Sequence, residues 1–142
     1  SGINVALGTD GAASNNNLNI MQDMYLFGVV YKGYFRDPTI ITPAEVLHAA
    51  TRAGALSQGR DDSGLLAVGM RADLCVLNTD TPQFTPMTSA ACNVVYAAQG
   101  ADIRMTMVDG EVLYRDGEFK TIDIEKVKAE VQRRTDSILS RL

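Results

Sequence analysis

A short apolar run that ends abruptly in a Gly-Thr-Asp-Gly turn is the feature that most constrains how this chain can fold. Residues 3–8 are apolar and bounded by glycine, which predicts a strand buried on both faces of a parallel sheet. Asp10 follows at the carboxyl end of that strand, and Ser14 is a candidate N-cap for a helix. In barrel and open α/β enzymes this edge carries the chemistry. We therefore expect Asp10 to bind a metal ion or to move a proton.

A structural interpretation of these residues stays open at this point. Asp10 precedes Gly11, and an aspartate in such a place can simply shape the turn between a strand and a helix. Residues 14–16 (Ser-Asn-Asn) are expected to cap the helix. His48, the single histidine, falls in an Ala-rich helical pattern, so we expect an ordinary helix residue and not a ligand.

Helical patterns occupy four parts of the chain. Residues 18–31 repeat apolar side chains at helical spacing. Residues 42–45 (Thr-Pro-Ala-Glu) have the composition of a capping box with proline at the first helical position. Residues 90–98 predict a short helix, and Asp123 is a possible cap for an amphipathic helix. The apolar stripe of that last helix comprises Ile124, Val127, Val131, Ile138 and Leu142.

The pattern changes to strands after Ser63. Residues 72–77 predict one strand, and residues 103–107 alternate between apolar and polar side chains, which is typical of a half-buried strand. Asp109-Gly110 is a strong hairpin signal, and residues 111–114 are expected to return as the second strand of that hairpin. We place a domain boundary near Ser63.

Composition argues against several classes of protein. The chain has 142 residues, is 46% hydrophobic and carries a net charge of −4 without a basic patch, so we expect no nucleic-acid partner. No apolar run approaches the roughly 20 residues that span a bilayer, so we expect no membrane partner. Cys75 and Cys92 have no neighbouring cysteine or histidine, which predicts buried, reduced thiols in a cytoplasmic protein.

Five sequence fragments together carry a family likeness. In chain order they are Gly8-Thr9-Asp10-Gly11 with Ser14-Asn15-Asn16, Thr42-Pro43-Ala44-Glu45-Val46-Leu47, Gly69-Met70-Arg71-Ala72-Asp73-Leu74, Asn93-Val94-Val95-Tyr96-Ala97-Ala98, and Val108-Asp109-Gly110. This set resembles the metal-dependent amidohydrolase superfamily, in the branch of the chlorohydrolases and the methylthioadenosine/S-adenosylhomocysteine deaminases. Met70 departs from the family pattern, which usually has lysine there. One fragment would be weak evidence, whereas five in the right order are strong.

The resemblance implies an α/β fold, namely the C-terminal third of a (β/α)8 TIM barrel with part of an accessory β-sandwich. Residues 1–63 would be the last strand and helices of the barrel, residues 64–120 part of the sandwich, and residues 121–142 a C-terminal amphipathic helix. The family binds a divalent metal, for which we expect Zn²⁺, through an His-x-His pair, two later histidines and a final aspartate. Asp10 matches that aspartate, and the other ligands have no counterpart in this sequence.

The resemblance also implies hydrolytic deamination of an adenosine-like nucleoside or a related nitrogen heterocycle, with Asp10 as metal ligand and catalytic residue. The isolated chain is expected to be inactive, because a catalytic zinc typically needs about three protein ligands. Guanine deaminase-like or triazine chlorohydrolase-like activity is one alternative, and a non-catalytic subunit that docks on a partner chain is another. An unpaired strand edge favours self-association, so we expect a homo-oligomer.

Overall fold

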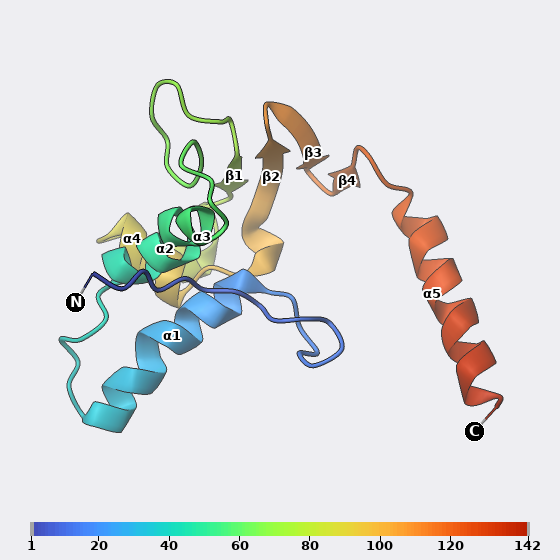
Figure 1. The fold of residues 1–142 in the computed structure, drawn as a ribbon, viewed down its shortest axis with the longest axis horizontal. Coiled ribbons are helices and arrows are strands. Elements are labelled where there is room, and N and C mark those ends of the chain that lie inside the picture. Colours follow the sequence, from blue (N-terminus) through green and yellow to red (C-terminus); the bar gives the residue numbers. More distant parts are fainter. Residues whose placement is uncertain (1, 142) are drawn as a thin grey trace.

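The computed structural model describes residues 2–141, so that Ser1 and Leu142 lie outside the described part (Figure 1). Its helices are α1 (Ile20–Phe35), α2 (Pro43–Ala50), α3 (Arg52–Ser57), α4 (Ala90–Tyr96) and α5 (Ile124–Leu139), with short 3-10 turns η1 (Pro82–Phe84) and η2 (Gly100–Asp102). Its strands are β1 (Leu74–Leu77), β2 (Ile103–Val108), β3 (Glu111–Arg115) and β4 (Glu118–Phe119). The predicted strands after Ser63 are confirmed, and β4 adds a short strand that the sequence pattern did not indicate.

The expectation of a buried strand at residues 3–8 is wrong. Residues 3–8 form no strand; they run along α2 and α3 instead. The Leu7 N–H donates to the Ala49 carbonyl at 2.9 Å, and Asn4 Nδ2 donates to the Ala53 carbonyl at 2.9 Å. An apolar segment becomes a strand only where a neighbour supplies a ladder of backbone partners. Within residues 2–141 no segment supplies one to residues 3–8.

Helix α1 also begins and ends later than expected. Its N-cap is Asn19, whose side-chain oxygen accepts from the Met21 N–H at 3.2 Å, so the expectation that Ser14 caps this helix is wrong. The helix continues to Phe35 and ends at Arg36, which adopts a left-handed conformation with φ 53°. A cap must lie directly before the first helical residue, and Ser14 lies six residues before Ile20.

Helix α2 begins at the predicted capping box. The Glu45 N–H donates to Thr42 Oγ1 at 3.4 Å, and the Thr42 N–H donates to Glu45 Oε2 at 2.7 Å. The Thr42 backbone N–H, and after it the Thr42 hydroxyl, lowers the pKa of Glu45 below its usual range. All the groups that make this cap lie within four residues, which is why the sequence alone could reveal it.

The hydrophobic core lies among α1, α2, α4 and η1, which we call the helical core. Its fully buried large side chains are Val46, Phe84 and Val95. Met21 and Met24 of α1 pack into the same cluster, as their helical spacing predicted. The core therefore joins residues from before and after Ser63, where the sequence suggested a boundary.

The four strands form one antiparallel sheet in the order β1-β2-β3-β4. Asp109 and Gly110 link β2 and β3 with positive φ angles of 52° and 81°, the conformation that a two-residue hairpin turn requires. Cys75 in β1 is exposed, so its expected burial is wrong; Cys92 in α4 is half-buried. As for residues 3–8, the reason is a missing neighbour, because within the described residues little packs against the sheet.

Helix α5 stands away from the other elements (Figure 1). It begins at the predicted cap, where Asp123 Oδ1 accepts from the Lys126 N–H at 3.0 Å. None of its residues from Ile124 to Leu139 is buried. Leu142, which the sequence placed on the apolar stripe, lies outside the described residues. No helix within residues 2–141 is both long and apolar enough to cross a membrane.

Candidate functional site

Asp10 lies in a tight turn between the opening segment and α1. Its φ is 60°, a left-handed conformation that aspartate tolerates better than most side chains. The backbone N–H groups of Ser14 and Asn15 both donate to the Gly11 carbonyl, at 3.1 and 2.8 Å. The turn therefore closes on itself immediately after Asp10, and the Asp10 side chain remains exposed.

The Asp10 carboxylate is held at both of its oxygens. The Gly11 N–H donates to Oδ1 at 2.7 Å, and the Ser14 hydroxyl donates to Oδ2 at 2.7 Å. The Ser14 hydroxyl, followed by the Gly11 N–H, lowers the pKa of Asp10 below its usual range. The group is therefore ionised at neutral pH. Two carboxylate oxygens offer about four lone pairs, so each oxygen keeps one for a further partner.

A second clamp fixes the base of this turn. Asn15 Nδ2 donates to the Thr9 carbonyl at 2.7 Å, and Asn15 Oδ1 accepts from the Asn17 N–H at 3.3 Å. Asn15 thus ties the residue before Asp10 to the segment that leads into α1. The hydrogen bonds that hold Asp10 and Asn15 come from the turn's own side chains and backbone.

The donor chemistry of Asp10 fits one ligand position of a divalent metal site, since an ionised carboxylate oxygen is a common zinc ligand. It does not fit a whole site. No group of three or more His, Cys, Asp or Glu side chains with suitable geometry occurs within residues 2–141. A complete site would need further ligands from outside the described residues.

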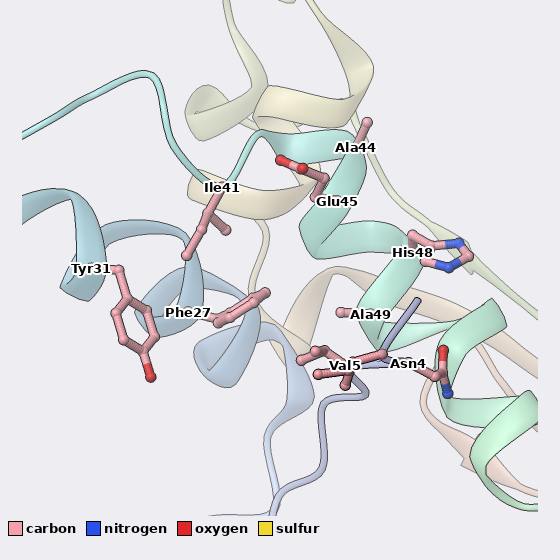
Figure 2. A pocket seen from close by; sticks show the side chains of 10 residues that line it. Asn4, Val5, Phe27, Tyr31, Ile41, Ala44, Glu45, His48 and Ala49 are labelled. Carbon is pink, nitrogen blue, oxygen red and sulfur yellow. The ribbon is translucent and has the colours of Figure 1, made fainter. Parts of the chain in front are cut away.

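An open apolar groove of about 650 Å³ lies between the opening segment, α1 and α2 (Figure 2). We call it the α1–α2 groove; it is lined by Ile3, Asn4, Val5, Phe27, Tyr31, Ile41, Ala44, Glu45, His48 and Ala49. Asp10 is not among these residues. His48 therefore lines a groove to which Asp10 does not contribute.

Comparison with known proteins decides the family. Residues 1–113 match the model of the Amidohydrolase family. The chain belongs to this family.

Two curated relatives are similar along nearly the whole chain. A 5-methylthioadenosine/S-adenosylhomocysteine deaminase of Acetivibrio thermocellus is 42% identical over 97% of the chain. A 5'-deoxyadenosine deaminase of Methanosarcina mazei is 37% identical over 99% of the chain. The chain spans about a third of the length of these relatives, 32% in each case.

A solved structure supports the same placement. An adenosine deaminase from Xanthomonas campestris with bound zinc superposes with a TM-score of 0.93 at 28% identity. The alignment covers 97% of this chain and 32% of that chain. The amidohydrolase fold expected from the five sequence fragments is confirmed, and so is the likeness to the deaminases.

Sequence reasoning missed the role of Ser14. We expected a helix cap, whereas its hydroxyl donates to Asp10. A weak signal was present, because an aspartate before glycine often forms a turn that hydrogen bonds to a nearby hydroxyl, and Ser14 lies within reach of such a turn. The apolar run that follows favoured the helix interpretation.

Proposed function

We propose that this chain is the C-terminal third of a metal-dependent aminohydrolase that deaminates an adenosine-like nucleoside of the methylthioadenosine or S-adenosylhomocysteine type. The observation that carries the proposal is the 42% identity to such a deaminase over 97% of the chain. The preset, ionised carboxylate of Asp10 supports it. In this layout residues 1–63 contribute to a barrel, residues 64–120 belong to an accessory sandwich, and residues 121–142 form the C-terminal amphipathic helix.

In the proposed enzyme, Asp10 supplies one ligand to a divalent cation. Zinc is the favoured ion because the Xanthomonas campestris deaminase contains it. Bound there, a divalent cation would supply Lewis acidity, which lowers the pKa of a water molecule toward neutrality. The Asp10 carboxylate would accept a proton from the attacking water, whose oxygen forms a bond to the ring carbon that carries the amino group. The carboxylate would then pass that proton to the amino group, which leaves as ammonia when the C–N bond breaks. The turn around Asp10 keeps the carboxylate oriented during this transfer.

The test is to express the complete reading frame that contains these residues. Purified protein should hold a divalent metal and convert 5'-methylthioadenosine or S-adenosylhomocysteine to the inosine-type product with release of ammonia. Guanine and a chlorotriazine, assayed in parallel, test the alternative activities. A reading frame without additional histidines, or a protein without metal and without deamination, would overturn the proposal in favour of a non-catalytic subunit.

Asp37 offers a matched control for Asp10. Its Oδ1 accepts from the Thr39 N–H at 2.8 Å and from the Thr39 hydroxyl at 2.6 Å, and the two contacts lower its pKa. It lies outside the family fragments. Asp10→Asn should therefore reduce kcat by roughly 100-fold or more, whereas Asp37→Asn should leave kcat within about twofold because its carboxylate holds only its own turn. Equal effects of the two substitutions would show that Asp10 is only a turn residue.

A further inference from the structure

The Ser14 hydroxyl has two acceptors within hydrogen-bond distance, the Asp10 carboxylate and the Gly11 carbonyl oxygen. Ser14 Oγ lies 2.7 Å from Asp10 Oδ2 and 3.2 Å from the Gly11 carbonyl oxygen. A hydroxyl has one proton, and the charged acceptor at the shorter distance receives the stronger hydrogen bond. The residue is exposed, so its hydroxyl is not needed to satisfy a buried group.

We infer that Ser14 is a positioning residue that holds the Asp10 carboxylate in the orientation in which it binds the metal. The inference rests on the proposed function and adds to it a residue that acts only through Asp10. The Gly11 N–H holds one carboxylate oxygen, but a single contact leaves the side chain free to change its rotamer about the bond between Cα and Cβ. The hydroxyl of Ser14 on the other oxygen removes that rotation.

Orientation matters because the two free lone pairs of Asp10 then point in set directions. One would be available to bind a cation and the other to accept a proton from the attacking water. Hydrogen bonds to metal-ligating carboxylates stabilise the ligand geometry, and loss of such a partner typically costs about 10- to 100-fold in metal affinity or activity. The neighbouring turn contacts, such as that of Asn15 with Thr9, do not touch the carboxylate.

The experiment compares three variants of the complete protein. Ser14→Ala should lower zinc affinity about tenfold, measured by competition with a chelator. It should lower kcat by a similar factor with KM nearly unchanged, because the oriented carboxylate acts on the reacting atoms and not on substrate binding. Ser14→Thr keeps the hydroxyl and should restore both values. Asn15→Ala, which loosens the turn without touching Asp10, should change zinc affinity much less than Ser14→Ala.

A second measurement does not depend on metal or activity. In the 142-residue chain, NMR couplings of the Asp10 side chain should report one rotamer in the wild type and an averaged mixture in Ser14→Ala. The inference is wrong if Ser14→Ala leaves the rotamer and the zinc affinity unchanged. It is also wrong if Asn15→Ala matches the effect of Ser14→Ala, because Ser14 would then act through the turn. A wild-type protein without zinc or deamination would instead overturn the proposed function, and the rotamers alone would then decide whether Ser14 orients Asp10.

Discussion

Helices α2 and α5 begin in the same way and end in very different surroundings. Each starts at a side-chain cap, Thr42 for α2 and Asp123 for α5. Helix α2 has only eight residues but buries Val46 completely, whereas α5 has sixteen residues and none of them is buried. The difference teaches that an amphipathic pattern and a cap predict that a helix forms, but not what its apolar face packs against.

The largest expected effect is therefore in the helical core. Phe84 is 1% exposed at the centre of the core, and Phe84→Ala should lower the free energy of unfolding by roughly 4 kcal/mol, through lost burial and an unfilled cavity. Ile138 on α5 is 61% exposed, and Ile138→Ala should cost less than about 0.5 kcal/mol. Urea unfolding of the 142-residue chain measures both. Comparable losses would mean that α5 packs on the core in solution.

Gly64 tests the packing of the residues after Ser63 against α3. Its φ is 84°, and a Cβ there would lie 2.8 Å from the Arg52 Cα and 2.9 Å from the Thr51 carbonyl oxygen. Because backbone atoms of α3 cannot yield cheaply, Gly64→Ala should destabilise the chain by about 3 kcal/mol. Gly117, at the end of the sheet, has φ 93° but open space around it.

Gly117→Ala is accordingly the control for Gly64→Ala. It carries the cost of the left-handed conformation, about 1 kcal/mol, without the steric clash. Thermal unfolding monitored by circular dichroism measures the two variants side by side. If both lose the same stability, conformational strain alone explains Gly64 and the close approach of α3 to the residues after Ser63 is not formed in solution.

The same contrast separates what the sequence could predict from what it could not. The capping box of Thr42 and the hairpin turn at Asp109 were predicted correctly because every atom involved lies within a few residues. The strand at residues 3–8 and the burial of Cys75 were not, because both depend on a neighbouring layer that the described residues lack. Caps and turns could be predicted from neighbouring residues, whereas the element that covers an apolar surface could not.

The same distinction between local and distant contacts applies to the candidate site. Asp10 could be found because a carboxylate after an apolar run is a recognisable pattern. Its partner Ser14 was misassigned as a helix cap because the same residue type serves both purposes, and only the turn geometry distinguishes them. Within residues 2–141 no group of three or more potential ligands occurs, so a metal site could only be expected through the family resemblance.

A moderate effect is expected from the helix caps themselves. Thr42→Ala removes a cap from a helix of the core and should lower the free energy of unfolding by about 1 kcal/mol. Asp123→Ala removes the cap of α5 and should reduce helix content without shifting the main unfolding transition, because α5 adds no buried residue. Far-UV circular dichroism combined with urea unfolding distinguishes the two. A shifted main transition in Asp123→Ala would show that α5 is coupled to the core.

The smallest expected effect concerns the charges of α5. Glu130 accepts hydrogen bonds from Arg133, at 2.7 and 2.8 Å, and from Arg134 at 2.7 Å, and these contacts lower its pKa from 4.5 to about 2. A lowered pKa in the folded helix means that the contribution to helix stability is complete above pH 4.5 and is lost as the pH falls toward 2. All three side chains are exposed, so the contribution is small and should weaken with salt.

An NMR titration of the Glu130 carboxyl group tests this directly, because the expected midpoint lies far below that of a free glutamate. Arg133→Ala should raise the midpoint more than Arg134→Ala, since Arg133 contacts both carboxylate oxygens and is the largest cause of the lowered pKa. The helix content of α5 should follow the same titration, while the buried residues of the helical core should not respond to it. A midpoint near 4.5 in the wild type would show that the arginines do not hold Glu130 in solution.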